Sequence, residues 1–121
     1  MGQKVNRHVI LGEILMRQIV FVYDSGDLLA FDGTAHAEQY MEAEDVKRGC
    51  YELFDSAGNR LDVVIDGPNV SIGAPSKDVQ DADRFIAIVE DFMRRAGVAG
   101  VRSLSAQEAA SEVVRMFGFS R

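Results

Sequence analysis

Two strand–turn–strand patterns, joined by a short helical stretch, constrain the fold of this chain more than any other feature. In the first pattern, Ile19, Phe21 and Tyr23 alternate with residues of the opposite face, as in a strand that is buried on at least one side. Gly26 and Gly58 lie where tight hairpin turns need a positive φ. The expected strands cover residues 17–23, 28–31, 50–55, 60–66 and, as a short fifth strand, 70–72.

The second half of the chain has a helical pattern. Apolar residues recur at i, i+3, i+4 and i+7 from Val79 to Ala96, which predicts a long amphipathic helix. We expect this helix to start near Ser76 or Asp78 and to end at Gly97.

Two further helices are predicted from their first residues. Thr34 can cap a short helix between the hairpins, with Tyr40 and Met41 on the side that faces the sheet. Ser105 and Glu108 have the spacing of a capping box, which predicts a final helix near the C-terminus.

Strands before residue 73 and helices after it predict an α+β fold. We expect a mostly antiparallel sheet of four to five strands with helices packed on one face. The 121 residues suit a single domain, residues 1–121, without disulfide or metal support. Residues 1–15, where Gly12 interrupts an apolar stretch, are expected to be less ordered than the rest.

The lone cysteine, Cys50, cannot form an internal disulfide, which fits a reducing compartment. The first residues lack a secretory-signal pattern, and no apolar run has the length of a membrane span. We therefore expect a cytoplasmic protein that does not insert into membranes.

Negative charge is concentrated in one stretch of the chain. The net charge is −6 overall, but residues 21–66 contain eleven acidic and three basic residues. Nucleic-acid binding needs a basic surface, so this distribution argues against nucleic acid as a partner. It is compatible with electrostatic steering toward a basic protein, or with a surface that only keeps the protein soluble.

No motif predicts an enzymatic reaction. The two histidines and the cysteine lack metal-ligand spacing, and no phosphate-binding loop or serine nucleophile elbow occurs. To act as a nucleophile, Cys50 would need His36 as its base. The simpler interpretation is that Cys50 is a small apolar residue of the fold. We predict no cofactor, no metal and no catalytic residues.

The remaining candidate site is an acidic surface around the first hairpin turn and the first helix. Tyr23, Tyr40, Met41 and Tyr51 are interleaved with it, either as apolar interface residues or as core. The candidate partner-binding residues are Asp24, Asp27, Asp32, Glu38, Glu42, Glu44 and Asp45.

Residues 19–61 resemble small bacterial immunity proteins, which are encoded beside polymorphic or contact-delivered toxins. The resemblance is carried by the hairpin of residues 19–31, the stretch Ala37-Glu38-Gln39-Tyr40-Met41-Glu42 and the hairpin of residues 49–61. It implies a sheet-and-helix domain that binds and neutralises one cognate toxin protein. It assigns no functional residues.

The sequence thus predicts an immunity protein that occludes the active site of its toxin with the acidic surface. Two alternatives remain open at this point. One is a small enzyme that uses carboxylates or Cys50, and the other is an adaptor domain that forms a homodimer through a sheet edge or its terminal helices.

Overall fold

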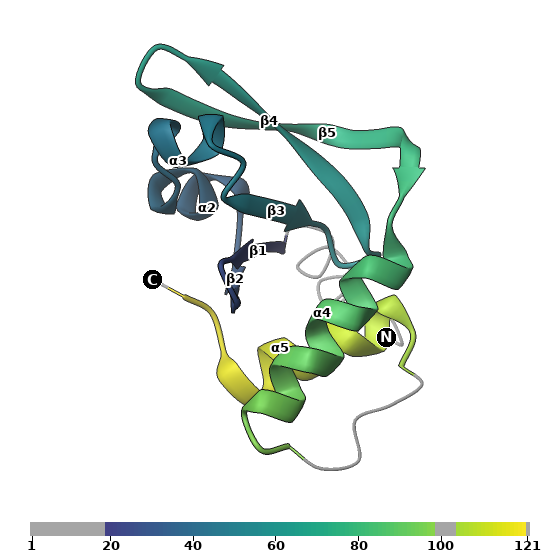
Figure 1. Cartoon of the computed structure of the whole chain (residues 1–121). Helices are drawn as coiled ribbons and strands as arrows, with labels where there is room; N and C mark the ends of the chain where they lie inside the picture. The colour runs from purple at the N-terminus through teal and green to yellow at the C-terminus, as the bar shows by residue number, and fades with distance from the viewer. Residues whose placement is uncertain (1–18, 99–103, 121) are drawn as a thin grey trace, which may run out of the picture.

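An antiparallel five-stranded sheet in the order β2-β1-β3-β4-β5 organises the molecule (Figure 1). The computed structural model describes residues 19–98 and 104–120, and only the backbone of residues 74–80. The expectation for residues 1–15 lies outside this range. The strands are β1 (Val20–Asp24), β2 (Asp27–Phe31), β3 (Tyr51–Phe54), β4 (Asn59–Asp66) and β5 (Asn69–Gln80). The helices are α2 (Thr34–Tyr40), α3 (Ala43–Lys47), α4 (Ala82–Arg95) and α5 (Ala106–Phe117).

The α+β class and the antiparallel sheet predicted from the sequence are confirmed. The first hairpin forms as expected: β1 and β2 are joined by the two-residue turn Ser25-Gly26, in which both residues have a positive φ. Such a turn matches the twist of the flanking strands and fixes their register.

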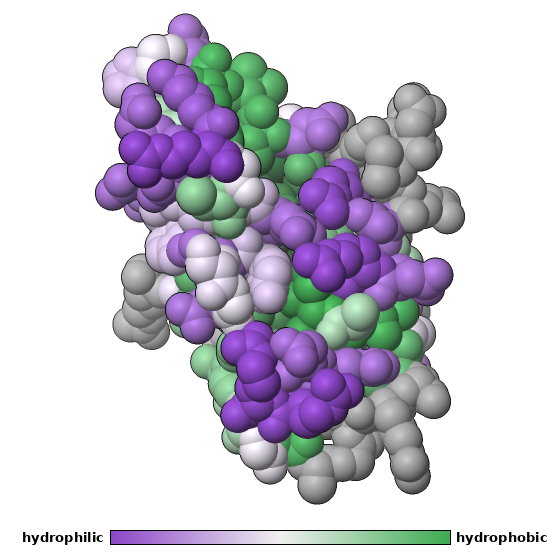
Figure 2. All heavy atoms as spheres, in the orientation of Figure 1, coloured by the Kyte–Doolittle hydropathy of each residue, from purple (hydrophilic) through white to green (hydrophobic). Residues whose placement is uncertain are grey.

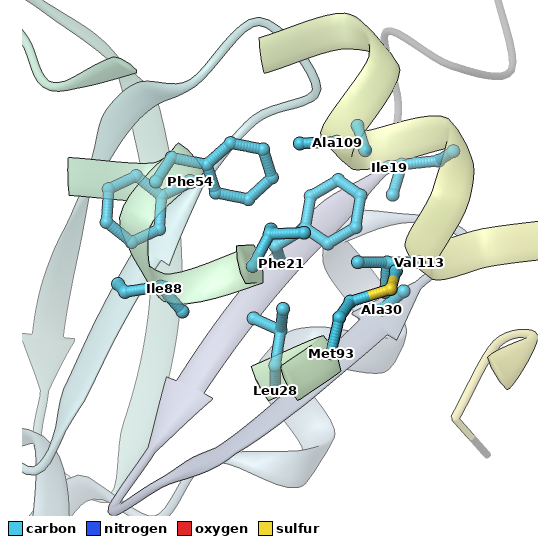
Figure 3. Close-up of a cluster of buried hydrophobic side chains, with 12 residues drawn as sticks. Ile19, Phe21, Leu28, Ala30, Phe54, Ile88, Met93, Ala109 and Val113 are labelled. Carbon is cyan, nitrogen blue, oxygen red and sulfur yellow. The ribbon is translucent and has the colours of Figure 1, made fainter. Parts of the chain in front are cut away.

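One face of the sheet packs against α4 and α5 and encloses the larger hydrophobic cluster (Figure 3). Phe85 of α4 is at its centre and is fully buried. Its ring centroid lies 5.1 Å from that of Phe21 and 5.3 Å from that of Phe54. This cluster contributes most of the burial that holds α4 on the sheet.

The opposite face carries a second cluster, which corrects the expectation that the helices pack on one face only. Here Val20 and Val22 of β1 contact Ala37 of α2 and Met41 just after it. The physical reason is that β1 is apolar on both sides: Phe21 is buried beneath α4, while Val20 and Val22 are buried beneath α2. A strand without a polar face requires cover on both sides.

The fifth strand is much longer than the expected residues 70–72, and the long helix starts later than Ser76 or Asp78. β5 continues through Gly73 and Pro75 to Gln80, and α4 begins at Ala82. A proline is tolerated because β5 lies at the edge of the sheet and pairs with β4 alone, with register shifts along the pair.

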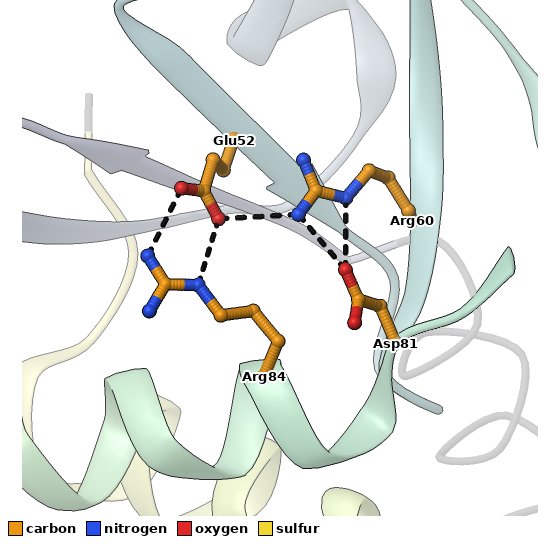
Figure 4. Close-up of polar contacts among 4 residues, drawn as sticks. All are labelled: Glu52, Arg60, Asp81 and Arg84. Atoms are coloured by element: carbon orange, nitrogen blue, oxygen red, sulfur yellow. Dashed lines mark hydrogen bonds and ion pairs between the residues drawn. The ribbon is translucent and has the colours of Figure 1, made fainter.

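A partly exposed ion network ties α4 to the sheet (Figure 4). Arg84 of α4 donates two hydrogen bonds to Glu52 of β3, at 3.0 and 3.1 Å. Arg60 of β4 bridges Glu52 at 3.2 Å and Asp81 at 2.9 Å. Asp81 sits at the N-cap of α4 without capping it, because its carboxylate binds Arg60 instead.

The final helix has the predicted capping box. The Ser105 hydroxyl accepts from the Glu108 backbone N–H at 3.1 Å, and the Glu108 carboxylate accepts from the Ser105 N–H at 3.0 Å. The bond from the Ser105 backbone N–H lowers the pKa of Glu108, and the Ser105 side chain adds a smaller effect in the same direction. After α5 the chain turns at Gly118 and runs toward β2, where the Ser120 N–H donates to the Ala30 carbonyl at 2.7 Å.

Candidate functional site

The candidate site is the region where α2 and α3 meet the β1–β2 hairpin and the tip of the β4–β5 hairpin. Residues 24–48 contain seven acidic and two basic residues, a net charge of −5. In Figure 2, hydrophilic residues gather over the α2–α3 region at the upper left, and a hydrophobic strip runs beside them along the β4–β5 hairpin. The structure divides the seven candidate carboxylates into two groups and two further residues that belong to neither.

The first group surrounds two tyrosines. The Tyr40 hydroxyl donates to Asp24 at 2.6 Å, and the Tyr51 hydroxyl donates to Asp45 at 3.2 Å. The two rings are 6.1 Å apart and meet edge to face. We call these four residues the tyrosine–aspartate cluster; Asp27 lies close by, because it pairs with Asp24 across the hairpin turn.

Negative charge dominates the electrostatics of this cluster. The hydrogen bond to Asp24 raises the pKa of Tyr40 well above its ordinary value, with burial and the charge of Asp24 as smaller causes. Burial raises the pKa of Tyr51, and the charge of Asp45 adds to it. Both hydroxyls therefore remain protonated donors at neutral pH.

Glu42 and Glu44 form the second group, at the rim of an open hollow between α3 and the β4–β5 turn. The hollow has a volume of about 600 Å³ and is lined by Met41, Glu42, Ala43, Glu44, Lys47, Gly67 and Pro68. The side chains of both glutamates are exposed. Among the described residues, their only ion pair is the 3.5 Å contact between Glu44 and Lys47. We call this hollow the acidic groove.

Asp32 and Glu38 belong to neither group. Asp32 is exposed and pairs with His36 one turn along α2. The Glu38 carboxylate accepts from the Ile72 backbone N–H of β5 at 2.7 Å, so it fastens α2 to the hairpin. Glu38 also lines a second, adjoining hollow of about 400 Å³ with residues of α2 and the hairpin tip.

The sequence pattern favoured core positions for Tyr40 and Tyr51, and the structure corrects this expectation for Tyr40. Tyr40 is 38 % exposed, whereas Tyr51 is half-buried and packs against the second cluster. Their hydroxyl partners are 16 and 6 residues away in sequence, so no local pattern signals them. The Glu52–Arg84 and Arg60–Asp81 pairs were likewise missed, because their partners are 32 and 21 residues apart.

Within residues 19–98 and 104–120, no cluster of three or more His, Cys, Asp and Glu side chains is placed to hold a metal ion. Cys50 is half-buried, and its backbone N–H donates to the Asp45 carbonyl at 3.0 Å. None of the described helices combines the length and the apolar character needed to cross a bilayer.

Comparison of the chain with family models, with curated proteins and with solved structures found no match. The site is therefore characterised by its own contacts. It combines an exposed aromatic ring, fixed carboxylates and an open groove with an acidic rim, a combination suited to binding a protein partner.

Proposed function

We propose that this chain is an immunity-type protein that binds one cognate toxin protein and neutralises it by occluding the toxin's active site. The observation that carries the proposal is the placement of an exposed, pre-positioned tyrosine inside a concentrated acidic surface. The resemblance of residues 19–61 to immunity proteins supports the same class of function.

Tyr40 has the properties of a central interface residue. Its ring packs 5.4 Å from that of Phe31 and 6.1 Å from that of Tyr51, and its hydroxyl is held by Asp24. Because these contacts fix the rotamer, little side-chain entropy remains to be lost on binding. Tyrosines in such positions are enriched among the residues that dominate interface energies.

The exposed carboxylates select the charge of the partner. Asp27, Glu42 and Glu44 are exposed to solvent, so their field extends beyond the surface and accelerates association with a basic protein. An inhibitor with this charge can enter the basic substrate cleft of a nuclease toxin by taking the place of phosphate groups. We therefore favour a toxin with a basic active-site cleft.

The first test is co-purification of the tagged protein from its native host. We expect a single stoichiometric partner, encoded by the adjacent gene and lethal when expressed without this chain. Recovery of the protein alone, under conditions in which the adjacent gene is expressed, would refute the proposal.

The second test places the surface. The double variant Glu42→Lys, Glu44→Lys is expected to weaken the complex at least 10-fold, because it reverses two exposed charges at the acidic groove. Asp62→Lys is the control for position, since Asp62 is exposed on β4 and alternates with the residues that face α2. A double control, Asp62→Lys with Asp83→Lys, matches the change in net charge and should alter affinity less than 3-fold. Equal losses in both doubles would assign the effect to net charge rather than to this surface.

A further inference from the structure

The outer edge of β2 is a second feature of the molecule that the proposed function does not use. The hairpin register pairs Val22 with Leu29 across a two-residue turn. In this register the backbone N–H and C=O groups of Leu28 and Ala30 point away from β1, because they alternate with the paired positions. β2 is the end strand of the sheet, and such an edge can accept another strand.

The C-terminal segment covers part of this edge. Beyond α5, the Gly118 N–H donates to the Val114 carbonyl at 2.9 Å, and the Ser120 N–H donates to the Ala30 carbonyl at 2.7 Å. The segment and β2 enclose a hollow of about 150 Å³. Residues 118–120, which we call the C-terminal strap, thus occupy one of the outward-pointing acceptors of β2.

Exposed apolar side chains lie beside the strap and on it. Met116, Phe117 and Phe119 are 40 %, 44 % and 42 % exposed, and Phe117 stacks edge to face on Phe92 at 5.0 Å. A buried aromatic side chain removes roughly 150–250 Å² from water, so these three expose on the order of 250 Å² of side-chain surface together.

We propose that the edge of β2 is a latent pairing surface for a second copy of this chain, masked by the C-terminal strap. Antiparallel pairing centred on Leu29 places Leu28 of each copy opposite Ala30 of the other. The outward N–H and C=O groups of both strands are then satisfied by one symmetric register. The pairing requires that Ser120 leave the Ala30 carbonyl.

The symmetry explains why a second copy fits this edge. The two-fold axis of such a pair is perpendicular to the sheet, so the α5 helices of both copies lie on the same face and their apolar ends approach each other. Met116 and Phe117, which stay in place when the strap leaves, expose roughly 170 Å² per copy, about a fifth of the 800 Å² that a stable dimer buries per partner. The unmasked pair should therefore be weak and depend on protein concentration.

The test compares the mass of full-length protein and strap variants by sedimentation velocity, from about 5 to 500 μM. We expect full-length protein to be a monomer and the chain truncated after Phe117 to double its mass. Ser120→Pro removes the N–H donor without shortening the chain and should give a measurable dimer fraction. Ser120→Ala keeps that donor and should remain a monomer. A dimer of the full-length protein would refute the masking role of the strap.

A charge swap at Leu29 tests the register. Leu29 is half-buried on the face opposite α5, and in the proposed pair it lies directly opposite its own copy. Truncated Leu29→Lys and truncated Leu29→Glu should each be monomers, and their mixture should form a heterodimer. The proposal is overturned if the folded truncated chain and Ser120→Pro both stay monomeric, or if both charged variants dimerise as well as the unsubstituted truncated chain.

Discussion

The ion pair between Glu52 and Arg84 offers a quantitative test of how α4 is held on the sheet. We consider the double-mutant cycle Glu52→Gln, Arg84→Gln and the combination of the two. The guanidinium contacts both carboxylate oxygens, at 3.0 and 3.1 Å, and Arg60 adds a third bond to the carboxylate at 3.2 Å. Glutamine removes the charge at either position, and the cycle subtracts the packing that each single substitution loses, so the coupling reports the interaction itself.

The exposure of the two side chains sets the expected magnitude. The side chain of Glu52 is 28 % exposed and that of Arg84 is 47 % exposed. Ion pairs on the surface contribute about 0.2–1 kcal/mol, and bidentate geometry places this pair at the upper end. We expect a coupling free energy of about 1 kcal/mol, which is a factor of about 5 in the unfolding equilibrium constant.

The same pair predicts a pH dependence. The hydrogen bonds from Arg84 lower the pKa of Glu52 below its ordinary value. A carboxyl group whose pKa is lower in the folded state stabilises the fold fully above its unfolded pKa, which is about 4.5. This contribution is lost as the pH falls through the folded pKa, so the coupling should be constant near pH 7 and should decline below about pH 4.5.

Urea unfolding at pH 7 and at pH 3 measures the coupling, and a second cycle is the control. Glu112 and Arg115 form a pair at 2.6 Å within α5, with side chains 35 % and 68 % exposed, and their coupling should be clearly smaller than that of Glu52 and Arg84, because solvent screens this pair more strongly. Equal coupling in the two cycles would show that bridging β3 and α4 adds nothing. A Glu52–Arg84 coupling that is unchanged at pH 3 would refute the electrostatic reasoning.

Three further substitutions test the packing and the helix ends. In urea unfolding, Gly58→Ala should destabilise the fold by more than Gly49→Ala. Both positions have a positive φ, so both substitutions are strained. A Cβ at position 58 would also lie 2.9 Å from the Ala82 Cα, whereas a Cβ at position 49 would meet open space. Phe85→Ala should lower the free energy of unfolding by about 3–5 kcal/mol, since its fully buried ring leaves a cavity between α4 and the sheet; a loss below about 1.5 kcal/mol would show that the cluster collapses around it. Ser105→Ala should lower it by about 1 kcal/mol through loss of the capping box, measured by thermal unfolding.

The sequence predicted those parts of the fold that depend on local patterns. Alternation identified β1, and the Ser105–Glu108 spacing identified the start of α5. β5 was underestimated because Gly73 and Pro75 normally interrupt a strand, and only its place at the sheet edge makes them tolerable. Cover on both faces of the sheet was missed, although the unbroken apolar run of β1 is the signal for it.

The charges of the candidate site could be predicted from the sequence, but the contacts of each carboxylate could not. The acidic stretch is visible in the sequence, but its division depends on contacts between distant segments. Asp24 at the end of β1 reaches Tyr40 only because α2 packs over β1. Glu38 and Ile72, which form a hydrogen bond, are 34 residues apart in the sequence. Such partners follow from topology, which neither composition nor periodicity contains.

The long β4–β5 hairpin has a consequence for how the molecule opens. Among the residues that the structure describes, β3 and β4 are in register only at Phe54 and Arg60, and the outer part of the β4–β5 hairpin has no neighbour in the sheet besides its own two strands. The bond from Ile72 to Glu38 links it to α2. In native-state hydrogen exchange, we expect the outer amides of the hairpin, such as that of Val64, to exchange by local opening while those of β1 exchange only on global unfolding. Such an opening would also change the width of the acidic groove, whose wall includes the hairpin turn at Gly67 and Pro68.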